Sequence, residues 1–228
     1  MKLKLIQKIQ ETTDTISLIF QPEEPFGWRA GQFLRYDLPH PNPDGRGTIH
    51  YFTIASAPHE SVIRLTYRID KNRMSSFKNA LNELSIDDEI DIDVPKGSFV
   101  IDDPALSYVF IAGGIGITPF RSILLDLEHR RFPLNIQLLY ANRTSEIIFK
   151  DDLDQLARKH PNFKVNYVIE PERINEGIIG KYVTGVSAAN FYVSGPEPMV
   201  MAMEEVLEKM GVGKEKIRHD YFPGYKSV

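Results

Sequence analysis

The sequence predicts a two-domain protein, with an antiparallel β-barrel first and an α/β domain built on a parallel sheet second. Three observations lead to this prediction. Short alternating segments fill the first hundred residues, strands and helices alternate after residue 104, and a buried strand at 108–112 leads into a glycine turn and a helix. Alternation of apolar and polar residues is typical of antiparallel strands, whereas strand–helix alternation is typical of βαβ units.

The first domain is expected to contain at least six short strands and one helix. The first strand begins near Leu3, and β-rich runs separated by turn residues follow it. These further strands are expected at residues 15–20, 31–38, 48–56, 62–69 and 89–94. A helix is expected from Ser75 to Glu83, with Phe77 facing inward. This pattern favours a closed barrel over a sandwich.

The second domain begins where the pattern changes, after Asp102-Asp103-Pro104. We therefore place a boundary near 98–104, between a domain at 1–100 and a domain at 104–228. Parallel strands are expected at residues 108–112, 136–140, 164–169, 190–194 and 216–221. Helices are expected at residues 119–131, 150–159 and 198–210. This spacing is that of βαβ units.

The glycine turn at 113–119 joins a strand of buried character to a helix start. Glycines at 113, 114 and 116 leave backbone amides open to a ligand, because no Cβ blocks the approach. Thr118 is predicted to cap the helix, with Pro119 at its first position. Such a helix start suits a phosphate or a ligand edge. A purely structural turn is the alternative, because Pro119 breaks the Gly-x-Gly-x-x-Gly dinucleotide fingerprint.

Three further segments could contribute to a site. Ser194-Gly195-Pro196 is a second turn after a strand of the same half, and two such turns would frame a crevice at the carboxyl ends of the strands. In residues 51–58 an apolar strand ends in small hydroxyl residues. A buried strand that runs into a turn is the simpler interpretation of this segment. Arg68 precedes residues 73–77, a hydroxyl-capped helix start that could hold a phosphate, although an ordinary capped helix is the alternative.

Composition excludes several classes of function. The net charge of −4 argues against broad nucleic-acid binding, which requires clustered cations. The lack of cysteine excludes disulfides, thiol catalysis and cysteine-ligated iron–sulfur clusters in this chain. The histidines show no metal-site spacing, so no metal is expected. No apolar run predicts a signal peptide or a membrane span, so a cytoplasmic protein is the default expectation.

Taken in order, five segments of the chain resemble the ferredoxin–NADP reductase superfamily. They are Gly31-Gln32-Phe33, His50 to Ser56, Ser75-Ser76-Phe77, Gly113 to Pro119 and Ser194-Gly195-Pro196. The resemblance covers essentially the whole chain. It implies a flavin-binding barrel followed by a nicotinamide-nucleotide domain, with hydride transfer from NAD(P)H to FAD. Electrons would then pass to a separate acceptor, either a ferredoxin, a flavodoxin, an oxygenase component or a small molecule.

The resemblance implies flavin-binding residues in the first domain. Phe52 would pack on the isoalloxazine, and Thr53 would lie near flavin N5 as a catalytic residue. Ser75 and Ser76 would hold the pyrophosphate in an amide-rich turn. The remaining flavin contacts are expected from His50, Tyr51, Arg68 and Met74.

The resemblance also implies nicotinamide-binding residues in the second domain. Asn142 and Arg143 are expected at the adenosine ribose, and Ser194 and Asp220 are the catalytic candidates. Phe222 belongs to an acidic-x-aromatic element that approaches the flavin. The two turns would contribute Gly113, Gly114, Gly116, Thr118, Pro119, Gly195 and Pro196.

Three residues depart from the pattern of the family. His50 stands in place of an arginine, so the permanent charge at the pyrophosphate is lost or comes from a neighbour such as Arg46. We therefore predict that flavin affinity weakens as the pH rises through the His50 pKa. Ser194 replaces a cysteine. Phe52 replaces a tyrosine, which keeps ring stacking without the phenol hydroxyl.

Some alternatives stay open at this stage. The chain could be a non-catalytic FAD-binding electron-transfer or regulatory subunit with weak nicotinamide binding, and FMN is an alternative to FAD. NADPH is slightly favoured over NADH, because Arg143 could pair with a 2′-phosphate and the usual acidic ribose ligand is missing.

Overall fold

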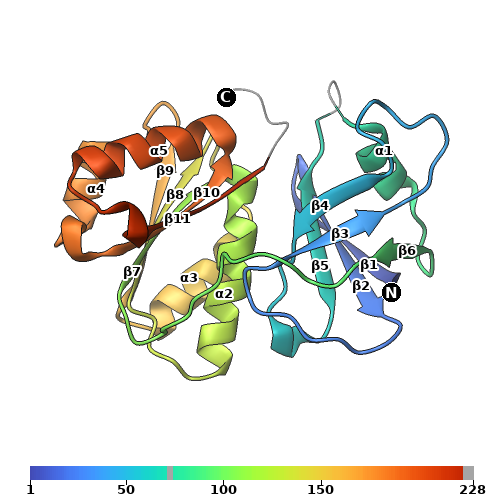
Figure 1. The fold of residues 1–228 in the computed structure, drawn as a ribbon, viewed down its shortest axis with the longest axis horizontal. Helices are drawn as coiled ribbons and strands as arrows, with labels where there is room; N and C mark the ends of the chain where they lie inside the picture. Colours follow the sequence, from blue (N-terminus) through green and yellow to red (C-terminus); the bar gives the residue numbers. More distant parts are fainter. Residues whose placement is uncertain (71–73, 223–228) are drawn as a thin grey trace. The chain divides into compact units, whose positions relative to one another are not determined.

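The computed structural model describes residues 1–70 and 74–222, apart from the side chain of Phe222. The chain divides into two compact units, Met1–Val100 and Ile101–Val228. The first unit contains an antiparallel sheet and the second a parallel sheet with helices, which confirms the predicted fold class (Figure 1). Among the described residues, no helix has the length and apolar character needed to cross a bilayer.

The N-terminal unit is a six-stranded antiparallel sheet in the order β4-β3-β6-β1-β2-β5. Its strands are β1 (Lys2–Thr12), β2 (Thr15–Pro22), β3 (Phe33–Asp37), β4 (Ile49–Thr53), β5 (Ile63–Arg68) and β6 (Glu89–Ile92). A hydrogen bond of 2.9 Å from Ala55 N, just after β4, to Arg64 O on β5 links the two ends of this order. The sheet therefore closes on itself as a barrel does, which shields its edge strands.

The alternating pattern of β5 shows how the barrel core is filled. Ile63, Leu65 and Tyr67 face the core and are almost fully buried. Between them Arg64 points away and pairs with Glu11 at 2.5 Å. Helix α1 (Ser76–Glu83) adds Phe77 and Leu81 to the same core. The two-residue period of the strand thus decides which side chains are buried.

The C-terminal unit is a five-stranded parallel sheet in the order β11-β10-β7-β8-β9. Its strands are β7 (Tyr108–Gly113), β8 (Ile136–Asn142), β9 (Phe163–Ile169), β10 (Asn190–Pro196) and β11 (Ile217–Phe222). Its α-helices are α2 (Thr118–His129), α3 (Lys150–Lys159), α4 (Glu176–Tyr182) and α5 (Glu197–Lys209). Short 3₁₀ turns are η1 (Pro58–Glu60) in the N-terminal unit and η2 (Gly114–Ile117), η3 (Val186–Ala188) and η4 (Lys214–Lys216) in this one.

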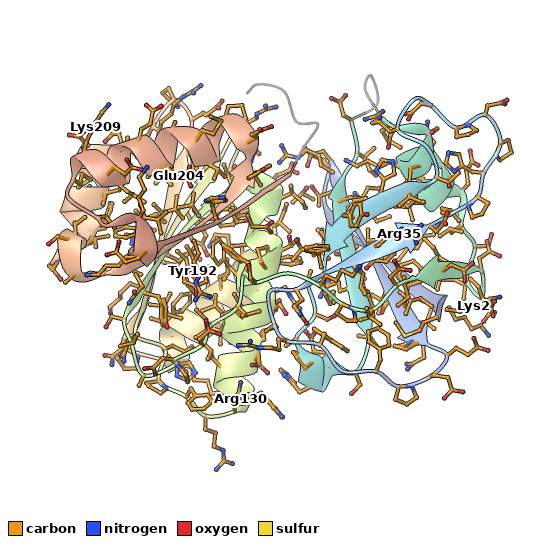
Figure 2. The ribbon with its side chains drawn as sticks, in the orientation of Figure 1. Lys2, Arg35, Arg130, Tyr192, Glu204 and Lys209 are labelled. Atoms are coloured by element: carbon orange, nitrogen blue, oxygen red, sulfur yellow. The ribbon has the colours of Figure 1, made fainter. Side chains whose placement is uncertain are left out.

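Helices cover both faces of the parallel sheet (Figure 1). On one face, Val109 and Ile111 of β7 share a core cluster with buried residues of α4 and α5. On the other face, Phe110 stacks on Phe120 of α2 with ring centroids 4.6 Å apart. Tyr192, at the centre of this unit in Figure 2, packs edge-on against Tyr108 at 5.5 Å. The continuous apolar run of β7 is therefore explained by burial on both sides.

Two local predictions were wrong. Thr118 does not cap α2, because the helix begins at Thr118 itself with Ile117 in the capping position. The Thr118 hydroxyl instead donates to the Ile115 carbonyl at 3.1 Å and closes the turn. Helix α4 was missed, since its two glycines and single buried turn give a weak helical pattern. The side chain of Asn175 caps it, accepting from Ile178 N at 3.0 Å.

Candidate functional site

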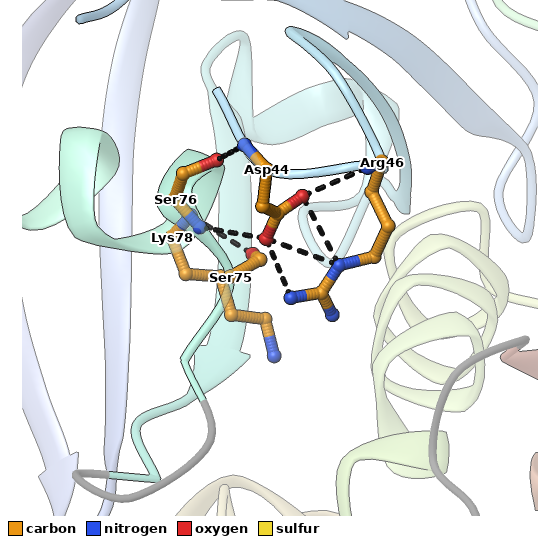
Figure 3. A network of polar contacts seen from close by, with 5 residues as sticks. All are labelled: Asp44, Arg46, Ser75, Ser76 and Lys78. Atoms are coloured by element: carbon orange, nitrogen blue, oxygen red, sulfur yellow. Dashed lines mark hydrogen bonds and ion pairs between the residues drawn. The ribbon is translucent and has the colours of Figure 1, made fainter. Parts of the chain in front are cut away.

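The N-terminus of α1 is organised by two serines and an aspartate (Figure 3). Ser75 caps the helix, as predicted, and its hydroxyl accepts from Lys78 N at 3.1 Å. The backbone N–H of Ser76 donates to a carboxylate oxygen of Asp44 at 3.1 Å, and Asp44 N donates to the Ser76 hydroxyl at 2.9 Å. The Arg46 guanidinium in turn donates to the Asp44 carboxylate, with 2.7 Å between Nη2 and Oδ2. An anion thus already occupies this helix start.

One face of β4 presents a group of aromatic rings beside α1. His50 stacks on Phe77 with ring centroids 4.3 Å apart, and Phe52 lies 5.9 Å from the same ring. Phe52 is partly buried and also meets Tyr36 edge-on at 5.7 Å. Tyr51 is exposed and packs against Phe33, so it points away from this face. The structure therefore groups His50 with Phe52, as the resemblance requires, and separates Tyr51 from both.

His50 carries a polar atom that no described residue satisfies. Its ring atom Nε2 is buried and has no hydrogen-bond partner among the described residues. Burial lowers the pKa of His50 below its ordinary value, and the Arg46 charge lowers it further, while Asp44 acts in the opposite direction. A buried ring nitrogen without a partner is uncommon, and a bound ligand would satisfy it. This observation fits an anionic ligand next to α1.

Two other residues expected at the flavin, Arg68 and Met74, contact residues of α1. Arg68 pairs with Asp14, with 3.1 Å between Nε and Oδ2, and its carbonyl accepts from Lys78 Nζ at 3.3 Å. The Met74 sulfur lies 3.9 Å from the Asn82 amide nitrogen. Thr53 is buried at the end of β4. Arg73, the cation before this helix start, lies outside the described residues.

In the C-terminal unit, the glycine turn packs directly on the end of β10. A Cβ on Gly116 would lie 2.2 Å from the Ser194 carbonyl oxygen, and a Cβ on Gly113 would lie 2.2 Å from the Met199 sulfur. Gly114 has a φ of 51°, in the left-handed region that favours glycine. Gly116 is thus required by a contact with backbone, whereas the flexible Met199 side chain could move away from a Cβ on Gly113. The expected access of a ligand to the backbone amides of this turn stays a prediction.

The two predicted turns do meet at one sheet edge. Ser194 pairs in register with Ala112 of β7 on one side and with Asp220 of β11 on the other. The Ser194 side chain is fully buried, and its hydroxyl oxygen has no hydrogen-bond partner among the described residues. The Tyr140 hydroxyl fixes the turn from β8 by donating to the Gly114 carbonyl at 3.0 Å. Parallel strands place these residues at their carboxyl ends, where such sheets bind ligands.

The remaining nucleotide candidates differ in accessibility. Asn142 is buried at the end of β8, and its amide lies 3.5 Å from the Tyr140 carbonyl. Arg143, the next residue, is exposed. Pro119 is buried in α2, and Pro196 is half-buried where β10 ends. Phe222 is described only through its backbone, which pairs with Pro196. Of the expected ribose contacts, Arg143 alone presents its side chain to solvent.

Sequence reasoning missed Asp44 and Lys78 at the start of α1. Asp44 lies in the polar Pro/Gly loop before β4, which patterning marks only as a turn. The backbone N–H of Lys78 donates to the Ser75 hydroxyl, and the positive charge of Lys78 lowers the pKa of His50. The signal that could have revealed Asp44 was the charged sequence Asp44-Gly45-Arg46. It ends four residues before His50, which stands where the family usually has an arginine.

Comparison with known proteins places this geometry in a family. The profile of the oxidoreductase NAD-binding domain matches residues 110–205. The reductase component of propane 2-monooxygenase from Rhodococcus jostii is 28% identical, across 92% of this chain and 60% of that protein. NADH-cytochrome b5 reductase 1 from Mortierella alpina is 28% identical, across 93% of this chain and 76% of that protein. The cytochrome b5 reductase domain of Ulva prolifera nitrate reductase superposes with a TM-score of 0.83 at 23% identity, across 96% of each chain.

In sequence and fold the chain is similar to proteins of the ferredoxin–NADP reductase superfamily, and its residues 110–205 match the oxidoreductase NAD-binding domain. This result confirms the resemblance drawn from the five sequence segments. The chain spans 59%, 60% and 63% of the length of the first three curated relatives that it matches. Those longer proteins include segments that have no counterpart in the described chain, so their complete activities are not carried over as they stand.

Proposed function

We propose that this chain is a flavin-dependent oxidoreductase that takes a hydride from NAD(P)H onto FAD and passes electrons to a separate acceptor. The observation that carries the proposal is the Nε2 of His50, which is buried without a partner among the described residues and lies beside Phe52 and the N-terminus of α1. It combines a ring-stacking face with an anion-binding helix start, as a flavin nucleotide requires. Relatives named as reductases along more than nine-tenths of the chain support the same assignment.

In this proposal the N-terminal unit, residues 1–100, binds the flavin. Phe52 would cover the ring system, and Thr53 would provide a hydroxyl at its reactive edge. Ser75 and Ser76 would offer backbone amides to the pyrophosphate, with His50 beside them. The flavin supplies the two-electron acceptor, and the chain supplies binding and orientation. Arg68 would act through its position near α1, because Asp14 already pairs with its charge.

The C-terminal unit, which contains the predicted domain at residues 104–228, would bind the nicotinamide nucleotide. The buried Ser194 hydroxyl has no partner among the described residues, so it is available to a polar group of the bound nucleotide. Gly113, Gly116 and Gly195 would keep this edge of the sheet narrow and free of side chains. Asp220 lies beside Ser194 on β11 and is the acidic candidate at the site.

The electron acceptor in this proposal is a separate redox partner. The chain has no cysteine, so it cannot bind a cysteine-ligated iron–sulfur cluster of its own. Two of the relatives are named for a monooxygenase and for cytochrome b5. An oxygenase component or a small haem protein therefore fits best, with a ferredoxin or flavodoxin as the other protein acceptors.

Anaerobic mixing with reduced nucleotide tests the proposal. The purified chain, reconstituted with FAD, should retain the flavin and lose its visible absorbance within seconds of adding NADH or NADPH. Mixing with oxidised nucleotide is the control and should leave the spectrum unchanged. A retained flavin that stays oxidised would favour the non-catalytic alternative, and a chain that retains neither FAD nor FMN would contradict the proposal.

Arg143 should influence the choice between the two nucleotides. We expect Arg143→Ala to lower kcat/KM for NADPH about tenfold and to change the value for NADH little, because a charge-assisted hydrogen bond to a 2′-phosphate contributes about 1.5 kcal/mol. Arg130→Ala is the matched control, since Arg130 is equally cationic but ends α2 beside Asp126. Equal losses with both nucleotides would show that Arg143 does not read the 2′-phosphate.

A further inference from the structure

The start of α1 is already occupied by a carboxylate of the chain itself (Figure 3). Asp44 Oδ2 accepts from Ser76 N at 3.1 Å, and the Asp44 backbone N–H donates to the Ser76 hydroxyl at 2.9 Å. The two residues are 32 positions apart, so this double contact fastens the loop before β4 onto the helix. We call the Asp44 contacts to Ser76 and Arg46 the Asp44 clasp.

The clasp also engages the nearest arginine. Arg46 approaches both carboxylate oxygens, with Nη2 at 2.7 Å from Oδ2 and Nε at 3.3 Å from Oδ1, and its backbone N–H donates to Oδ1 at 2.9 Å. About half of the Arg46 side chain is exposed. The hydrogen bonds from Arg46 hold the pKa of Asp44 below its ordinary range, so the carboxylate is charged at neutral pH. The Asp44 carboxylate therefore accepts hydrogen bonds from both the Ser76 amide and the Arg46 guanidinium.

A pyrophosphate needs those same donors. A backbone N–H is a single donor, so the Ser76 amide cannot fully serve a carboxylate and a phosphate together. Two anions within hydrogen-bonding distance of one amide also repel each other strongly. His50, Lys78 and Arg46 surround this point, and Asp44 is the acidic group among the charges acting on His50. Binding of a phosphate at Ser76 thus requires the carboxylate to move.

We propose that Asp44 is a built-in competitor of the flavin pyrophosphate, which must open the Asp44 clasp and thereby releases Arg46 to pair with the phosphate. This inference rests on the proposed flavin-binding function of the N-terminal unit. It explains how a chain with His50 in place of an arginine gains a permanent cation at the pyrophosphate, since Arg46 becomes available only when Asp44 leaves. Flavin affinity is then set by the fraction of molecules in which the clasp is open.

The test compares flavins with and without the pyrophosphate on the full-length, flavin-free chain. Dissociation constants for FAD and riboflavin are measured by fluorescence for the wild type, Asp44→Asn and Asp93→Asn. Asp93 is the matched control, because it also pairs with an arginine, Arg35 of β3, at 3.2 Å in the same unit (Figure 2 labels Arg35). Both substitutions remove one negative charge, so the net charge of the chain changes equally.

We expect Asp44→Asn to bind FAD about tenfold more tightly than the wild type. This factor follows if the clasp is closed in about nine-tenths of flavin-free wild-type molecules, because only the open fraction binds FAD. Riboflavin affinity should stay within about twofold, and Asp93→Asn should leave both constants within the same margin. Unchanged or weaker FAD binding by Asp44→Asn would overturn the proposal, and weaker binding would identify Asp44 as a residue that positions Arg46. A wild type that binds neither flavin would refute the proposed function itself, and the inference with it.

Hydrogen exchange on the wild type tests the same proposal without a variant. The Arg46 backbone N–H is held by Asp44 in the clasp. Saturating FAD should therefore accelerate exchange at Arg46, whereas riboflavin should not, and the Ser76 amide should stay protected because phosphate replaces the carboxylate. Slower or unchanged exchange at Arg46 with FAD would show that the clasp stays closed and would overturn the proposal.

Discussion

His50 shows how much the meaning of one residue depends on its surroundings. The sequence marks it as a titratable replacement for an arginine, and an exposed histidine would be half-charged near pH 6.5. In the structure it stacks on Phe77, and its buried Nε2 has no partner among the described residues. Burial then lowers its pKa, so in the unbound chain His50 carries less positive charge than an exposed histidine would at the same pH. Arg46 is left as the permanent cation.

The pH dependence of flavin binding should follow this lowered pKa. FAD affinity is expected to strengthen as the pH falls toward the lowered His50 pKa and to weaken as the pH rises, because the protonated ring attracts the pyrophosphate. The unbound chain should lose stability over the same range, since the unfolded state takes up the proton first.

The measurement is the FAD dissociation constant from pH 5.5 to 8, with riboflavin as the reference ligand that lacks phosphate. His50→Gln should abolish the pH-dependent part that riboflavin does not share. A dissociation constant for FAD that stays constant across the whole range, relative to riboflavin, would contradict this prediction.

At the scale of elements, the junction between η2 and β10 is the tightest feature of the C-terminal unit. Gly116 faces the Ser194 carbonyl so closely that any side chain would collide with backbone. Backbone atoms cannot rotate away as a flexible side chain can, so a Cβ here must push the two turns apart. The local sequence shows only a Gly-rich turn and does not reveal the contact with a segment almost eighty residues later.

Gly116→Ala should therefore destabilise the protein by about 2 kcal/mol or more, within or above the usual cost of overpacking. Gly180→Ala is the control, because Gly180 lies in α4 with open space around its Cβ position and should gain about 0.4–1 kcal/mol. Chemical denaturation of both variants measures the difference. A stability of Gly116→Ala equal to that of the wild type would mean that the turns can separate at no cost.

The accuracy of the predicted elements follows the strength of their patterns. Strand β5 was predicted within a residue at each end, because its apolar and polar residues alternate without exception. Helix α4 was missed, because seven residues with two glycines give neither length nor propensity. The two expected helix caps had different outcomes. Ser75 caps α1 as expected, whereas Thr118 lies inside its helix and bonds back to Ile115.

At the scale of the whole molecule, each unit has its own hydrophobic core. The barrel core gathers apolar residues from all six strands and α1, and the sheet of the second unit is packed by helices on both faces. The change of sequence pattern near residue 100 has this physical origin, because a barrel needs alternating strands and a covered parallel sheet needs apolar ones. Each unit would thus offer one of the two cofactor sites proposed above.

The sequence by itself determined the fold class and the order of the candidate segments, because strand period, turn chemistry and the order of short motifs are local properties. The tertiary structure alone decided which candidates share a site. It joined Ser194 to the glycine turn and placed Asp44 on the helix start that a phosphate would need. These facts depend on contacts between distant segments, and the energy of such contacts is fixed only when the chain has folded.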